Sequence, residues 1–285
     1  MPDPIKREHF YHAEATALSG HFDLPVNQQV ESRIYTKLPE TGGYLAQRSD
    51  AFRVESVLYY RSAYTQVAGN KDVKAGHGWT SLATAVVEGL NVLDIVTADR
   101  VVGQVSVEHP LVGYVPRVTF LGTRFDNLRI AGHPVKLDLH PDLFGSSPAS
   151  DGAYTRDQGF LGRVASQFEH LHRQPDLPAE VHGRYNRLPA TSGEGALKQE
   201  KVECSLINQA DGAYPGRSFG HVIKVPDFGT IYLATVSVEH SDFQDQTGVP
   251  KETLIHLNML ELEMGCLASG SVKVSAMIVN GRSKP

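Results

Sequence analysis

Two stretches of the sequence decide the fold class: RVVGQVSVEH, from Arg100 to His109, and TIYLATVSVEH, from Thr230 to His240. In both, large apolar side chains alternate with polar ones over much of the segment, and Val, Ile and Thr are abundant. Alternation with a period of two, together with β-branched residues, is typical of half-buried β-strands. We therefore expect a strand in each stretch.

Runs of the same kind recur along the chain, and they include FRVESVLYY from residue 52, TLIHLNMLELEM from residue 253 and SVKVSAMIV from residue 271. Glycine and proline separate these runs, and we expect turns at Gly42–Gly43, Gly69–Asn70, Gly113, Gly132, Pro226 and Gly248. Short strands with little helix between them favour antiparallel sheets. The predicted fold class is mainly β, arranged as a sandwich or as barrel-like sheets.

One region departs from this pattern. Between Asp157 and Gln174, apolar residues recur at helical spacing, Asp157 can cap the start, and Pro175 ends the segment. A second short helix is expected near Pro178, carrying Val181, Tyr185 and Leu188, and a polar loop follows from residue 191 to 201. We therefore predict a helical hairpin and loop over residues 151–201, inserted between a first β-rich part (1–150) and a second one (202–285).

The two β-rich parts share sequence. The pentapeptide VSVEH occurs from Val105 to His109 and again from Val236 to His240. Further matches follow in the same order on both sides, pairing Val92, Asp94, Thr97, Ala131, Val135 and Lys136 with Val225, Asp227, Thr230, Ala268, Val272 and Lys273. This predicts an internal duplication of about residues 76–140 and 215–279. The alternative is convergence, because strands draw on few residue types.

Composition excludes several classes of protein. The 285 residues are 41% hydrophobic, which suffices for a sizeable core and argues against a disordered chain. The net charge is -5, with no basic run, so we expect no nucleic-acid partner. No apolar window long enough for a membrane span or a secretory signal occurs, which predicts a cytoplasmic protein that does not act at a membrane. Two cysteines, Cys204 and Cys266, are too few for a disulfide framework.

A serine motif invites a hydrolase interpretation. Gly216 to Gly220 reads G-x-S-x-G around Ser218, with Asp242 or Asp245 and then His256 in an order that suits a triad. However, a nucleophile elbow joins a strand to a helix, and here a turn-like segment precedes a strand. A glycine-rich turn between strands is the better interpretation, and Ser218 is a weak catalytic candidate.

Metal and cofactor motifs are not apparent. The 13 histidines include His9 with His12 and His170 with His172, and neither spacing forms a zinc motif. No phosphate-binding glycine loop occurs, so we expect no cofactor and no metal. The lone Trp79 is better explained as a core anchor than as a stacking platform.

The repeated Glu-His pairs are the remaining catalytic candidates: Glu108 with His109, and Glu239 with His240. Along a strand, the valines and the histidine share one face while serine and glutamate share the other. Adjacent residues therefore point apart, and neither glutamate can easily orient its own histidine. We favour a structural role, in which the imidazole closes the core and the carboxylate meets a cross-strand arginine.

These observations leave two functions open. The first is a non-enzymatic binding or assembly protein, which contacts a protein partner or its own copies through its β surfaces. The alternative is a small-molecule enzyme with a Glu/His acid-base pair in a sandwich or barrel cavity. Convergence of the four Glu and His side chains on one cavity would favour the enzyme.

Overall fold

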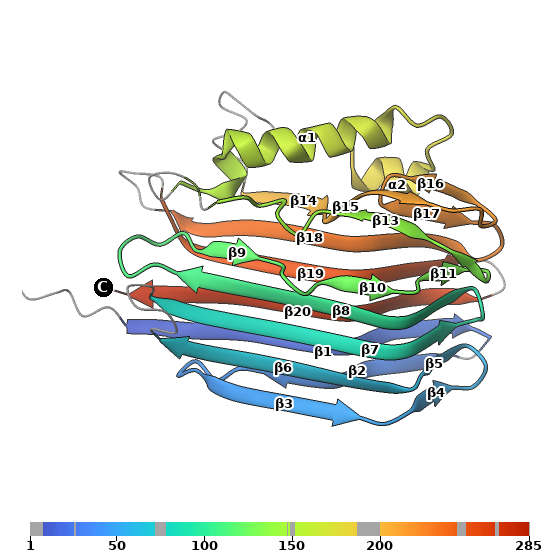
Figure 1. Ribbon diagram of the computed structural model, residues 1–285, viewed down its shortest axis with the longest axis horizontal. Coiled ribbons are helices and arrows are strands. Elements are labelled where there is room, and N and C mark those ends of the chain that lie inside the picture. Colours follow the sequence, from blue (N-terminus) through green and yellow to red (C-terminus); the bar gives the residue numbers. More distant parts are fainter. Residues whose placement is uncertain are drawn as a thin grey trace, which may run out of the picture.

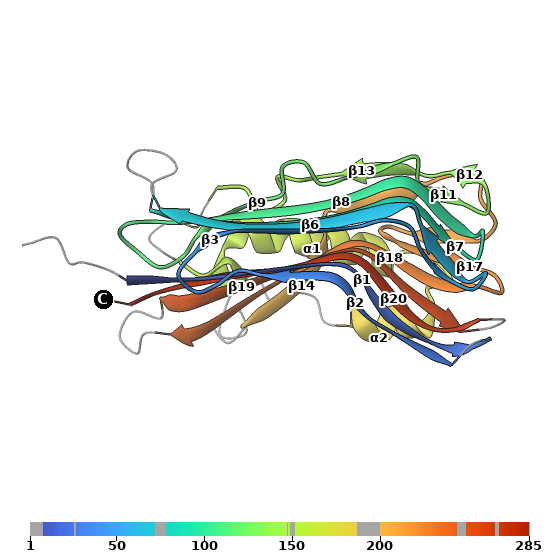
Figure 2. The same ribbon diagram turned by 90° about the horizontal axis from the view of Figure 1, so that it is seen from below.

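Two antiparallel sheets lie face to face in this protein, as a computed structural model shows (Figure 1, Figure 2). The structure describes residues 8–25, 27–71, 78–146, 148, 152–186, 200–243, 249–265 and 268–284, with the backbone alone for 31–33 and 283–284. Every strand pair in the described residues is antiparallel, and neither sheet closes into a barrel. The predicted mainly β, sandwich-like class is therefore confirmed.

The first sheet has eight strands and combines both ends of the chain. Its order is β16 (Arg217–Phe219), β17 (Val222–Val225), β18 (Gly229–Phe243), β19 (Pro250–Gly265), β20 (Ser269–Lys284), β1 (Glu8–Leu24) and β2 (Gln28–Lys37), with β14 (Lys201–Ser205) also paired to β18.

The second sheet has ten strands, and β7 and β8 lie at its centre. Its members are β3 (Gly43–Ser49), β4 (Phe52–Val54), β5 (Leu58–Tyr60), β6 (Ser62–Lys71), β7 (Trp79–Val92), β8 (Val96–His109), β9 (Arg117–Thr119), β10 (Arg124–Asp126), β11 (Arg129–Ile130) and β12 (His133–Pro134). A separate two-stranded sheet pairs β13 (Lys136–Leu139) with β15 (Ile207–Asp211).

The core fills the space between the two large sheets. Alternate residues of the central strands, such as Val105 and Val107, are fully buried, as a sandwich interior requires. The sheets approach closely at Gly103 of β8, where a Cβ would collide with the side chains of Met259 and Met277. Beside this point, Ser275 of β20 donates a 3.3 Å hydrogen bond to the carbonyl of Val101.

Helix α1 (Gln158–His172) lies along one edge of the sandwich, preceded by the 3₁₀ turn η2 (Tyr154–Arg156) and followed by α2 (Ala179–Arg184) (Figure 1). The side chain of Asp157 caps α1 by accepting a 2.7 Å hydrogen bond from the Phe160 amide. Both helices begin where the sequence predicts. Leu188 and residues 191–199 of the predicted loop lie outside the described residues.

One strand prediction and one turn prediction were wrong. Phe52–Tyr60 is a hairpin and not one strand, because Glu55 adopts a positive φ of 42° and the Val57 amide bonds the Val54 carbonyl. Gly69–Asn70 is not a turn but lies within β6. A Cβ at Gly69 would collide with Leu38 and Tyr11, so this glycine makes room for packing between the sheets.

The internal duplication is not confirmed. The tight turns after Val92 and Val225 do match, since Asp94 and Asp227 both have positive φ. The surroundings differ, because β8 has a long partner before it and short ones after it, whereas β18 has short β17 before it and long β19 after it. Lys136 begins the small sheet while its counterpart Lys273 lies within β20, at the centre of the first sheet.

The division of the chain into parts 1–150 and 202–285 does not follow the division into sheets. Strands β1 and β2 come from the first part, yet β1 pairs with β20 along its length. Both parts therefore contribute to the first sheet.

The cap of α1 yields a stability prediction. Asp157→Ala should lower the free energy of unfolding by about 1 kcal/mol, because the Phe160 amide loses its acceptor. Asp157→Asn should retain most of the stability that the cap contributes, since asparagine also caps helices. Urea unfolding of both variants checks this, with exposed Ser146→Ala as a control. Equal losses in the Ala and Asn variants would contradict a capping role.

Candidate functional site

The best-formed candidate site lies where the chain leaves the first sheet. Strand β14 pairs with β18 up to Ser205, and the chain then joins β13 of the small sheet from Ile207 onward. Gln167 of α1 satisfies backbone groups at this crossing. Its side chain accepts a 2.9 Å hydrogen bond from the Ser205 amide and donates to the carbonyls of Ser205 at 3.0 Å and Ile207 at 3.2 Å.

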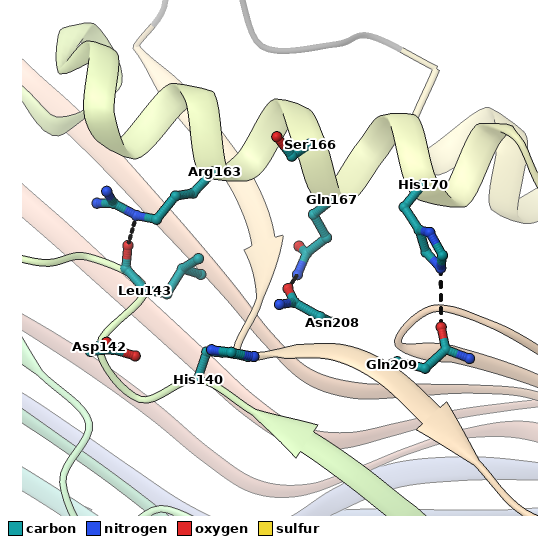
Figure 3. Close-up of a pocket in the computed structure, with 9 residues that line it drawn as sticks. All are labelled: His140, Asp142, Leu143, Arg163, Ser166, Gln167, His170, Asn208 and Gln209. Atoms are coloured by element: carbon teal, nitrogen blue, oxygen red, sulfur yellow. Dashed lines mark hydrogen bonds between the residues drawn. The ribbon is translucent and has the colours of Figure 1, made fainter.

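A cavity of about 540 Å³ opens between α1, the turn after β13 and strand β15 (Figure 3). Pockets of about 300–1,000 Å³ are typical of small-molecule sites. The lining side chains come from these three segments: Arg163, Ser166, Gln167 and His170 from α1, His140, Asp142 and Leu143 from the turn, and Asn208 and Gln209 from β15.

Buried Gln167 fixes one wall of the cavity. In addition, its amide nitrogen lies 3.1 Å from Oδ1 of Asn208, so three acceptors share its two N–H groups. With Oδ1 engaged, the amide N–H groups of Asn208 remain as donors at the cavity surface. Arg163 braces the opposite wall, where its Nε donates to the carbonyl of Leu143 at 2.7 Å.

Two histidines complete the lining. The Nε2 atom of His170 lies 3.1 Å from Oε1 of Gln209, which joins α1 to β15 (Figure 3). The Nε2 atom of His140 lies 2.9 Å from a carboxylate oxygen of Asp138, and this contact is an ion pair when the imidazole is protonated. The Nε2 atoms of both histidines therefore lie against oxygen atoms of neighbouring side chains.

The sequence did not point to this cavity, because three distant segments build it. One signal was available. Gln167 lies three residues after Val164 and four before Leu171, on the apolar face of α1, and a polar residue in such a stripe marks a buried hydrogen-bonding role.

The Glu-His pairs adopt the predicted facing. Val105, Val107 and His109 are buried while Glu108 is half-buried, and the second pentapeptide shows the same alternation. In register, Arg117 of β9 lies opposite Glu108. On the other strand, Lys201 lies opposite Glu239 with its Nζ 3.8 Å from the carboxylate.

His109 belongs to a buried ring cluster. Its ring centroid lies 4.7 Å from that of His9, which stacks on Trp79 at 4.9 Å. Trp79 is therefore a core anchor. Burial lowers the pKa of His9 to about 4 and holds that of His109 well below its ordinary value, so both rings are neutral. No described residue forms a hydrogen bond with Nε2 of His109.

His240 has different partners. Its Nε2 accepts a 2.9 Å hydrogen bond from the Tyr154 amide, and its Nδ1 lies 3.0 Å from the Thr253 hydroxyl. Burial lowers the pKa of His240 to about 4. The neutral ring thus ties η2 to strands β18 and β19, which is a structural arrangement.

The four Glu and His candidates lie outside the cavity beneath α1. None of Glu108, His109, Glu239 and His240 lines the cavity beneath α1, nor either of two smaller cavities of about 390 and 210 Å³. The smallest holds His256 among the ion-paired Arg184, Glu203 and Glu261.

Ser218 does not sit on a nucleophile elbow. It lies in β16, and a turn leads directly to β17, so the motif joins strand to strand. Its hydroxyl donates to the carbonyl of Gly220 at 3.1 Å. Asp242 pairs instead with Lys251 and Arg282. Asp245 lies outside the described residues.

The described residues contain no group of three or more His, Cys, Asp or Glu side chains placed to hold a metal ion. Neither described helix has the length and apolar character that crossing a membrane requires.

The two histidines yield a stability prediction. His109→Ala and His240→Ala should each lower the free energy of unfolding by about 1–3 kcal/mol, because one removes core packing and the other two buried hydrogen bonds. Exposed His133→Ala should change little. Chemical denaturation measures all three, and intact stability in both buried variants would refute the structural role.

Buried neutral histidines also predict acid sensitivity. The pKa falls to about 4 in His9 and His240 and to about 3 in His221, all through burial. Below about pH 6.5 the unfolded chain takes up protons that the folded chain does not, so each histidine removes up to about 1.4 kcal/mol of stability per pH unit. The urea concentration at the unfolding midpoint should therefore decrease as the pH is lowered from 7 to 5, before the carboxylates titrate. A constant midpoint over that range would contradict this.

Comparison with known proteins gives a family without an assigned function. None of the curated proteins matches the sequence. One family model, a domain of unknown function, matches residues 9–239, a span from β1 into β18 that includes α1 and every residue lining the cavity beneath it. The chain therefore belongs to the family described as domain of unknown function DUF8256.

Proposed function

We propose that this protein is a non-enzymatic binding protein that holds a small polar molecule in the cavity beneath α1. The observation that carries the proposal is the prearranged wall built by Gln167. This side chain is only 7% exposed, and its hydrogen bonds to Ser205, Ile207 and Asn208 fix the wall without a ligand. Fixed polar groups in a concave, partly apolar space favour binding because little ordering remains to be done.

The lining suggests the chemistry of the ligand. Asn208 supplies amide donors from one wall. On the other wall, Nε and Nη2 of Arg163 donate to the carbonyls of Leu143 and Phe144, which leaves Nη1 as a donor for a ligand. Buried Leu143 adds an apolar surface between them. These features suit a compact molecule with oxygen acceptors, such as carbonyl, carboxylate or hydroxyl groups, on an apolar frame.

An enzyme is the second candidate, for one reason. At the cavity, His140 faces the Asp138 carboxylate at 2.9 Å, and a histidine beside a carboxylate is a common acid-base arrangement. Both side chains are substantially exposed, at 41% and 59%, which weakens the pair as a proton-transfer device. The Glu-His pairs of β8 and β18 give this alternative no support, because they lie outside the cavity.

The proposed setting is the cytoplasm, without a nucleic-acid or membrane partner. The net charge of -5 favours the first of these exclusions. Cys204 is a free, fully buried thiol, and burial raises its pKa, which suits a reducing compartment.

A thermal-shift screen of small metabolites, followed by calorimetry on each hit, tests the proposal. For a true ligand, Asn208→Ala should weaken binding about tenfold, the scale of one lost hydrogen bond in a cavity. Exposed Asn127→Ala, in the bend between β10 and β11, is the control and should bind normally. If the ligands bind Asn208→Ala as tightly as the unmodified protein, the cavity is not their binding site.

The same samples separate binding from catalysis. Mass spectrometry of each ligand after prolonged incubation should recover it unchanged. Turnover that disappears in His140→Ala would instead establish the enzyme.

A further inference from the structure

Strand β3 is an open edge of the second sheet. Among the described strands it pairs with β6 alone (Figure 1). From Gly43 to Arg48 every residue is exposed. Tyr44 and Leu45 are 63% and 43% exposed, so both faces of the strand carry an accessible large apolar side chain. Its unpaired edge also presents backbone N–H and C=O groups that can template another strand.

The inner side of β3 remains accessible. Within the described residues the first sheet ends at β2, and Thr36 of β2 hydrogen-bonds Thr65 of β6 across the interior. Strand β2 also approaches β3. Leu45 pairs with the buried Val67 and thus points to the inner side, yet it is 43% exposed.

The edge has little of the usual protection. Proteins block exposed edge strands by keeping them short, or with charged side chains, proline, inward charges or bulges. The register of β3 with β6 runs without a bulge from Gly43–Gly69 to Ser49–Ala63, and Arg48 is the only charged residue in the strand. An edge that is straight and nearly uncharged is suited to strand addition.

We propose that β3 pairs antiparallel with β3 of a second copy of this chain, which joins the two ten-stranded sheets around a two-fold axis. In such a pair, opposed residues point to the same face, so the axis must pass between identical residues. Centring it on Ala46 uses the whole strand. This register sets Tyr44 opposite Arg48 of the partner subunit, and Leu45 opposite Gln47 of the partner subunit.

A cation–π pairing between identical strands supports the second copy as the occupant. A guanidinium over a tyrosine ring is a favourable cation–π contact, and the two-fold axis forms it twice on the outer face. The same register keeps the two Arg48 side chains apart. Each copy thereby supplies the tyrosine of one contact and the arginine of the other, so the pairing is complete with two copies.

Sedimentation from about 1 to about 100 µM tests the proposal, with a dimer expected within that range. Tyr44→Arg sets a like charge opposite Arg48 of the partner subunit and should raise the dimer Kd about tenfold or more. The double variant Tyr44→Arg, Arg48→Tyr restores the pair with its members exchanged and should recover the dimer. Leu121→Arg, on an exposed loop residue, is the control and should dimerise normally.

Crosslinking tests the register. Ala46→Cys places two thiols across the axis and should give a covalent dimer on mild oxidation. Ser49→Cys places them about 20 Å apart along the strands and should not. A monomer throughout the concentration range, a larger assembly, or a dimer indifferent to Tyr44→Arg would overturn the proposal. Crosslinking of Ser49→Cys without Ala46→Cys would overturn the register.

Discussion

The pairing of β1 with β20 is the constraint on which the rest of the structure depends. These are the first and last of the described strands, and they run side by side from Glu8–Lys284 to Leu24–Ser269 in the interior of the first sheet. Gly20 and Gly270 lie at this junction, where a Cβ on either residue would strike the backbone of the opposite strand. Because the contact joins segments that lie far apart in the sequence, all the other described strands belong to the chain between them, and the first sheet depends on a long-range contact.

Several features follow from that pairing. It sets β20 opposite β8, where Met277 fills the space above Gly103 and Ser275 bonds the Val101 carbonyl. The other side of the sheet then ends near β14, where α1 covers the margin. There the chain leaves the first sheet at Ser205, and the side chain of Gln167 forms hydrogen bonds with the Ser205 backbone in place of a neighbouring strand. The cavity thus results from the way in which α1 covers this edge of the sheet.

Local features of the fold could be predicted from the sequence, and long-range ones could not. Asp157 and the apolar spacing that follows it act within one helical turn, so the start of α1 was predictable. The alternation in VSVEH likewise fixed which side chains are buried. Gly69 was predicted as a turn residue, but it is a glycine because a Cβ there would collide with the ring of Tyr11. That ring lies 58 residues away in another sheet, so the local sequence could not show this. The cavity was missed for the same reason, since its walls meet only in the folded chain.

The repeated pentapeptide shows how far such local information reaches. His109 and His240 occupy the same place in their strands and are both buried and neutral. Yet His109 packs among His9 and Trp79, while His240 bonds Tyr154 and Thr253. Identical neighbours in sequence therefore met different neighbours in space. A strand that must bury two valines and a terminal imidazole accounts for the local pattern, and the partners of each ring are decided by the sheet that faces it.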